Sequence, residues 1–93
     1  MRSNTLFRVT CLADDPLAPA RVIGVFASRW LLPQRFSSWL SEAGVVQMEV
    51  ELNLREGEGT GPRHLARVLQ RIPVVLSVEL LVDGLVTAHE PGS

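Results

Sequence analysis

VVQMEVELNL, residues 45–54, alternates apolar and polar side chains without interruption. Val46, Met48, Val50, Leu52 and Leu54 point one way, and the polar side chains between them point the other. This period of two predicts a strand with one buried and one solvated face. The stretch decides the fold, because other elements must cover the buried face.

Three further stretches predict strands that pair with this one. QRFSSWLS, residues 34–41, also alternates, and the tight turn EAG at residues 42–44 joins the two into a hairpin. TLFRVTCLA, residues 5–13, and VVLSVELLV, residues 74–82, have the apolar content of buried strands. The remaining residues, 84–93, are predicted to form a flexible C-terminal tail.

Two helices are predicted between the strands. Proline is tolerated only in the first turn of a helix, so Pro16 and Pro19 place one helix start near residues 15–19, and this helix runs to about Arg29. Its predicted buried stripe comprises Ala18, Val22, Val25 and Phe26, widened by Ile23 and Trp30. PRHLARVLQRI, residues 62–72, predicts the second helix, whose apolar residues recur at helical spacing: Leu65, Val68, Leu69 and Ile72.

The predicted element order is therefore β-α-β-β-α-β. Two helices with one apolar stripe each cover one face of a four-stranded antiparallel sheet, which is the α+β, ferredoxin-like arrangement. We expect a single domain over residues 1–83, since the chain has only 93 residues. A core of this size is thin, so association with another chain would stabilise it.

Composition excludes several function classes. A net charge of −1 gives no reason to expect nucleic-acid binding. The sequence has neither an apolar run of about 20 residues, as a membrane span needs, nor a signal-peptide core, so we expect a cytoplasmic protein with no membrane partner. The single Cys11 allows no internal disulfide, and its apolar surroundings predict a buried, inert thiol.

The sequence offers no convincing catalytic or metal-binding group. Asp14 and Asp15 are adjacent, so their carboxylates do not converge; they cap the first helix or contact a ligand. Arg63, Arg67 and Arg71 form a stripe on the second helix, which is a solvated face or a docking surface for an acidic partner. RNA-recognition domains share this fold, but their central strands carry stacking aromatics, and here those strands offer only Phe7, which points inward.

Two stretches carry a family resemblance. The acidic turn and Pro16 precede ARVIGVFASR at residues 20–29, and RVLQRIPVVLSVELL closes the fold at residues 67–81. Together they resemble an ACT domain, and most of all the short regulatory (small) subunits of acetolactate synthase. The matching positions are Pro16, Arg21, Val22, Gly24 and Phe26 in the first stretch, and Leu69, Ile72 and Val78 in the second.

The resemblance implies a non-catalytic subunit that binds and activates the large subunit of acetolactate synthase, in the synthesis of branched-chain amino acids. Thiamine diphosphate, Mg and FAD would belong to that partner, and this chain would hold no cofactor. ACT domains pair through edge strands, so the resemblance implies a homodimer or higher oligomer. The predicted dimer edge comprises Arg35, Ser37 and Trp39.

The resemblance also implies an amino-acid effector site between paired domains, at the turn before the first helix. The corresponding residues are Asp14, Asp15, Pro16, Leu17, Ala18 and Leu32. Leu17 replaces the usual glycine and Leu32 the usual asparagine, so we expect valine feedback to be weak or absent. Two other hypotheses remain open: a stand-alone amino-acid-sensing ACT module acting on another enzyme or pathway, and an RNA-binding domain.

Overall fold

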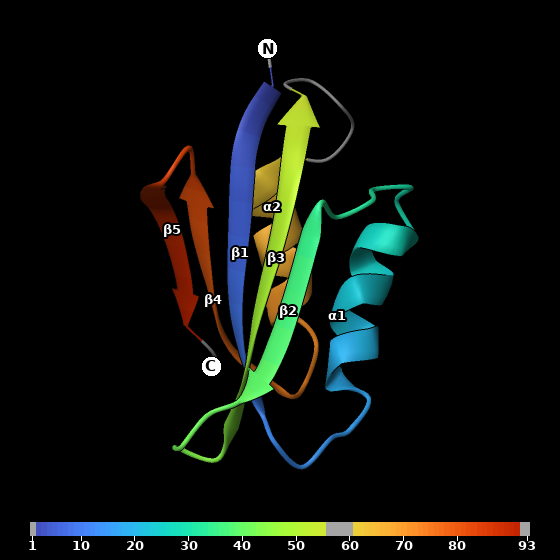
Figure 1. Cartoon of the computed structure of the whole chain (residues 1–93), viewed down its shortest axis with the longest axis vertical. Coiled ribbons are helices and arrows are strands. Elements are labelled where there is room, and N and C mark those ends of the chain that lie inside the picture. The colour runs from blue at the N-terminus through green and yellow to red at the C-terminus, as the bar shows by residue number, and fades with distance from the viewer. Residues whose placement is uncertain (1, 56–60, 92–93) are drawn as a thin grey trace.

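The computed structural model describes residues 2–55 and 61–91. Two helices and five strands follow one another along the chain (Figure 1). They are β1 (Arg2–Leu12), α1 (Ala18–Ala27), β2 (Arg35–Leu40), β3 (Val45–Arg55), α2 (Pro62–Gln70), β4 (Val75–Val82) and β5 (Leu85–Pro91).

All five strands form one antiparallel sheet in the order β2-β3-β1-β4-β5. Both helices lie on the same side of this sheet, and the other face is open to solvent (Figure 1). The first four strands and the two helices have the predicted βαββαβ arrangement, so the α+β, ferredoxin-like fold class is confirmed. The predicted hairpin is confirmed too, with β2 at one edge of the sheet.

The prediction of a flexible tail over residues 84–93 is wrong for Leu85–Pro91, which pair with β4 as a fifth strand. Asp83 and Gly84 connect the two strands with φ angles of 51° and 83°. Two successive positive φ values give the tight turn whose twist matches that of a hairpin. The turn is also fastened to β1, because the Asn4 N–H donates to Asp83 Oδ1 at 3.0 Å and the Asp83 N–H donates to the Asn4 carbonyl at 2.7 Å.

The core lies between the sheet and the helices. From β1, Phe7, Val9 and Cys11 have no exposed surface, as their shared face predicts. The Phe7 ring meets the Phe26 ring of α1 edge to face, with centroids 5.3 Å apart. α2 contributes three buried side chains at helical spacing: Leu65, Ala66 and Leu69. The apolar stripe of each helix therefore covers the buried face of the sheet, which is why this sequence folds into two layers.

Leu69 and Leu85 make a matched pair for testing where stability resides. Leu69 is fully buried beneath α2, whereas Leu85 on β5 is 71% exposed. We expect Leu69→Ala to lower the free energy of unfolding by about 2–5 kcal/mol, through lost burial and the cavity left behind. Leu85→Ala should change it by no more than about 0.5 kcal/mol. Urea unfolding followed by circular dichroism measures both, and similar losses for the two variants would contradict the assignment of the core.

Candidate functional site

The turn between β1 and α1 is organised by Asp15. Its Oδ1 accepts a hydrogen bond from the Leu17 N–H at 2.9 Å, and its backbone carbonyl accepts one from the Ala18 N–H at 3.1 Å. Its Oδ2 accepts from Nε of Arg21, one turn into α1, at 3.0 Å. One carboxylate thus fixes both the path of the turn and the position of the arginine beside it.

The prediction that Asp14 or Asp15 caps α1 is wrong. The residue at the N-cap position is Leu17, and no side chain makes a capping hydrogen bond there. α1 begins at Ala18 with Pro19 in its first turn, so Asp15 lies two residues before the cap position. From there its carboxylate reaches the Leu17 N–H but not the first free N–H groups of the helix.

Hydrogen bonding stabilises the ionised form of the Asp15 carboxyl group. The bond from the Leu17 N–H, followed by the contact with the Arg21 guanidinium, holds the pKa of the Asp15 carboxyl below its usual value. The carboxyl group is therefore ionised at neutral pH.

The structure brings only part of the predicted effector site together. Asp14, Asp15, Pro16 and Leu17 are adjacent in the turn, but Ala18 is fully buried in the core and cannot touch a ligand. Leu32 is 88% exposed and follows the other end of α1. A helix of 10 residues is about 15 Å long, so Leu32 is far from the turn within one chain. Effector binding at these residues stays a prediction, and it would require Leu32 from a second chain.

The predicted dimer edge is indeed an edge of the sheet. β2 pairs only with β3, and Arg35, Ser37 and Trp39 lie opposite Glu51, Glu49 and Gln47. Their side chains share the open face of the sheet, where Trp39 is half exposed. The strand order confirms the position of this edge; the dimer itself stays a prediction.

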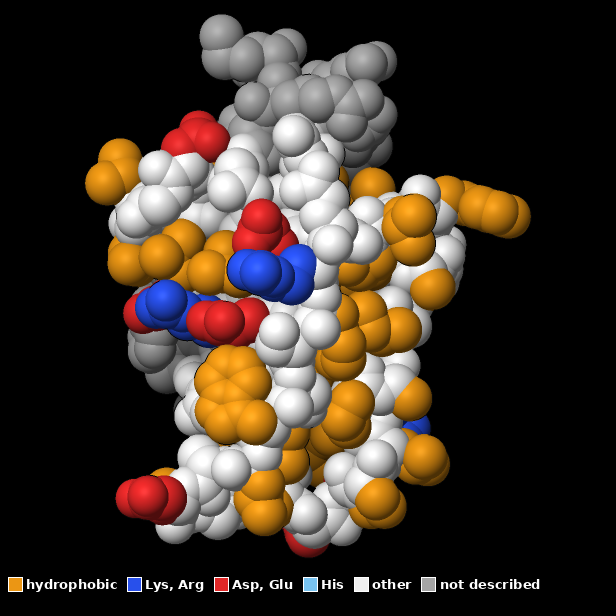
Figure 2. Space-filling view, in the orientation of Figure 1, with side chains coloured by type: hydrophobic (Ala, Val, Ile, Leu, Met, Phe, Trp, Pro, Cys, Tyr) orange, Lys and Arg blue, Asp and Glu red, His pale blue; other side chains and the backbone are white. Residues whose placement is uncertain are grey.

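Sequence reasoning missed an apolar groove beside this edge, between α1 and β2. Figure 2 shows hydrophobic side chains gathered along this side of the molecule. The groove has a volume of about 480 Å³ and is lined by Ile23, Ala27, Trp30, Leu31, Leu32, Pro33 and Phe36.

Trp30 explains why the groove was missed. The sequence predicts Trp30 in the buried stripe of the first helix, but the indole is 96% exposed. α1 ends at Ala27, and Trp30 adopts a φ of 58°, in the left-handed region that a residue other than glycine seldom occupies. The chain therefore leaves the helical path before Trp30, and the side chain points out of the core.

The open face of the sheet is polar at its centre. Arg8 on β1 donates from Nε to Glu49 on β3 at 3.0 Å and from Nη1 to Glu79 on β4 at 3.2 Å. In the next row, the Thr10 hydroxyl donates to Gln47 at 3.0 Å. The central strands thus present a carboxylate–guanidinium–carboxylate row in place of stacking aromatics. That arrangement argues against the RNA-binding hypothesis, since two carboxylates repel a phosphate backbone.

The described residues offer little for catalysis. Among residues 2–55 and 61–91 no group of three or more His, Cys, Asp or Glu side chains is placed to hold a metal ion. Cys11 is buried, as predicted, and burial together with the charge of Asp15 raises the pKa of its thiol to about 11. Such a thiol is not a nucleophile at neutral pH.

Within residues 2–55 and 61–91, no helix has the length and apolarity to cross a membrane.

Comparison with known proteins gives structural matches only. No protein family and no curated protein sequence matches the chain. The structure is similar to the ACT domain from GTP pyrophosphokinase of Chlorobium tepidum, with a TM-score of 0.70 and 14% identity over 87% of this chain and 100% of that domain. It is also similar to the C-terminal domain of the MgtC protein from Mycobacterium tuberculosis, with a TM-score of 0.66 and 17% identity over 87% of each chain. The fold is therefore ACT-like.

The contact between Asp15 and Arg21 should depend on pH. Because the folded-state pKa of Asp15 is lowered, its contribution to stability is present above the unfolded-state pKa and is lost as the pH falls through the folded-state value. In a double-mutant cycle with Asp15→Asn and Arg21→Gln, we expect a favourable coupling in the free energy of unfolding at pH 7. At about pH 2 this coupling should be smaller, because acid protonates the carboxyl group. Chemical denaturation at both pH values measures it, and a coupling of equal size at pH 2 would contradict the contact.

Proposed function

We propose that the chain is a non-catalytic regulatory domain that binds the catalytic subunit of acetolactate synthase and raises its activity. The observation that carries the proposal is the match to an entire solved ACT domain, the one from GTP pyrophosphokinase. The described part of the chain has no group of three or more His, Cys, Asp or Glu side chains placed to hold a metal ion. The partner is suggested by the turn-and-helix stretch at residues 20–29 and the closing stretch at residues 67–81, which resemble the short regulatory subunits of that enzyme.

A second candidate function is an amino-acid-sensing domain that regulates a different enzyme. The specific observation in its favour is the same comparison, because the matching ACT domain comes from GTP pyrophosphokinase. The two candidates share the fold and differ only in the partner. The identity of the enzyme that responds to the chain decides between them.

Self-association is part of the proposal, and the β2 side of the molecule supports it. β2 leaves one row of backbone N–H and C=O groups unpaired at the edge of the sheet, and such a row accepts a further strand. Beside it lie the apolar groove and the exposed Leu40. Pairing β2 with its copy would extend the sheet across two chains and cover part of this apolar surface.

The two edge strands provide a matched test of the dimer. Leu40 on β2 is 69% exposed and Leu85 on β5 is 71% exposed. Lysine on an edge strand opposes strand pairing, so we expect Leu40→Lys to be a monomer and Leu85→Lys to sediment like the native dimer. Sedimentation velocity at tens of micromolar measures the state. A native chain that sediments as a monomer under these conditions would contradict the self-association.

The regulatory role is tested with the catalytic subunit itself. Added to an acetolactate synthase catalytic subunit from the same organism, the chain should raise the rate of acetolactate formation from pyruvate, and alone it should form none. An unrelated ACT domain added at the same concentration controls for nonspecific stabilisation. If the cognate subunit responds no more to this chain than to the control, the proposed partner is wrong, and the second candidate function becomes the better one.

A further inference from the structure

Both helices and the turns that follow them lack acidic residues. The chain has 10 Asp and Glu residues, yet none occurs in residues 16–34, which contain α1, or in residues 61–74, which contain α2. The same two stretches hold five of the nine basic residues: Arg21, Arg29, Arg63, Arg67 and Arg71. The helices therefore carry positive charge with no carboxylate of their own to balance it.

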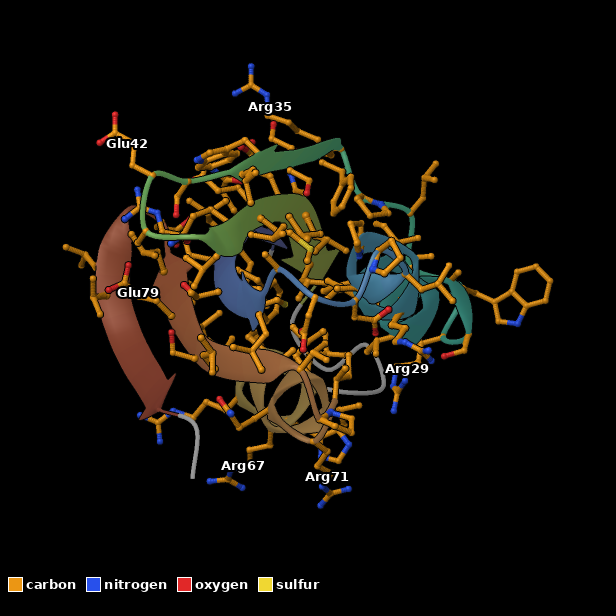
Figure 3. All side chains as sticks on the ribbon, turned by 90° about the horizontal axis from the view of Figure 1, so that it is seen from below. Arg29, Arg35, Glu42, Arg67, Arg71 and Glu79 are labelled. Carbon is orange, nitrogen blue, oxygen red and sulfur yellow. The ribbon has the colours of Figure 1, made fainter. Side chains whose placement is uncertain are left out.

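Three of these arginines form a stripe on α2. Arg63, Arg67 and Arg71 recur every fourth residue, and all three are exposed. Residues four apart lie on one face of a helix, where like charges repel and a glutamate is the usual compensation. The guanidinium groups of Arg67 and Arg71 make no ion pair or hydrogen bond with the other residues that the structure describes. Both project from the helix layer, away from the sheet (Figure 3).

An aliphatic groove lies beside this stripe, between α1 and the C-terminal end of α2. It has a volume of about 470 Å³, and Val25, Val68, Ile72 and Pro73 form its walls. Arg71 lines it as well, so the groove and the stripe adjoin. The three aliphatic walls Val25, Val68 and Ile72 are only half-buried. An apolar side chain that covers them would gain free energy by leaving water.

We propose that the outer face of α2 and this groove bind an acidic, amphipathic segment of a partner protein. Aliphatic side chains of the segment lie in the groove, against Val25, Val68 and Ile72. Its carboxylates pair with the guanidinium groups of Arg67 and Arg71, because planar guanidinium groups bind carboxylates through paired hydrogen bonds. An apolar anchor with charged groups around it is the usual anatomy of a protein interface.

Two other occupants fit this surface less well. A nucleic-acid backbone would pair with the arginines, but it has no aliphatic side chain for the groove, and the net charge of −1 does not attract a polyanion. A second copy would have to present the open face of its sheet. There Arg8 already engages both Glu49 and Glu79, so little negative charge is left to offer.

This surface is separate from the sites discussed above. It uses neither the turn at residues 14–17 nor the β2 edge, and it concerns the chemistry of a contact rather than the identity of an enzyme. It therefore does not rest on the proposed function. A chain that activates acetolactate synthase but does not bind the probe described next would lose this surface and keep its proposed function.

The test is fluorescence anisotropy with labelled synthetic peptides and the full chain. The probe is a peptide of about 12 residues, in which Glu and Leu recur so that a helix has one acidic and one apolar face. One control peptide has Lys in place of each Glu, and the other has Ala in place of each Leu. We expect saturable binding of the Glu–Leu peptide, binding at least about tenfold weaker for the Ala peptide, and none for the Lys peptide.

Two exposed arginines on opposite sides of the molecule provide the matched variants. Arg67 projects from the helix layer and Arg35 from β2 (Figure 3). Arg67→Gln should weaken binding of the Glu–Leu peptide about fivefold, through loss of one exposed ion pair. Arg35→Gln removes the same charge and should leave binding unchanged. Val68→Thr keeps the shape of the groove but adds a hydroxyl group, so it should weaken the Glu–Leu peptide more than the Ala peptide.

Four results would overturn the proposal. The first is no binding of the Glu–Leu peptide, and the second is equal weakening by Arg67→Gln and Arg35→Gln, which would mean that net charge alone attracts the peptide. The third is tighter binding of a single-stranded RNA with the same charge as the peptide, which would assign the face to nucleic acid. The fourth is self-association that Arg67→Gln abolishes, which would assign it to a second copy.

Discussion

The position of β1 in the middle of the sheet governs the rest of the structure. It pairs with β3 along Arg2–Leu12 and with β4 along Thr5–Cys11. Side chains alternate between the two faces of a strand, so a slip of one residue would move Arg8 and Thr10 into the core. The ion pairs of Arg8 with Glu49 and Glu79 lie on the open face and oppose such a slip. Exposed pairs of this kind add at most about 1 kcal/mol each to stability, so their main role is to specify register.

This central strand also determines where the grooves of the molecule lie. Its buried face requires both helices on one side, and two short helices leave a groove along each flank of α1. The outer groove is apolar and borders an unpaired strand edge, which suits association with another chain. The inner groove is bordered by Arg21, Arg71 and Asp15. One helix therefore separates two surfaces of different chemistry.

Regular patterns were predictable from the sequence, and departures from regularity were not. β3 and α2 were predicted almost to the residue, because their apolar side chains keep a strict period of two and a strict helical spacing. β5 was missed although Asp83-Gly84 is a strong hairpin signal, because the residues after it lack a clear alternation. The exposure of Trp30 depends on one left-handed backbone angle, which residue type alone does not reveal. The groove between α1 and the C-terminal end of α2 was beyond sequence reasoning, because it joins residues that are some 50 positions apart.

The net charge of −1 conceals a separation of charge between the two layers. Among the described residues, the helix side carries four arginines and one carboxylate: Arg21, Arg29, Arg67, Arg71 and Asp15. On the open face of the sheet three carboxylates outnumber two arginines: Glu49, Glu51 and Glu79 against Arg8 and Arg35. The described part of the chain is therefore more positive on its helix side than on the open face of its sheet, which gives it an electric dipole. In the field of a charged partner such a dipole turns before contact, so the helix layer would face an acidic surface first. At physiological ionic strength this orientation begins only within about 8 Å, and added salt shortens that range.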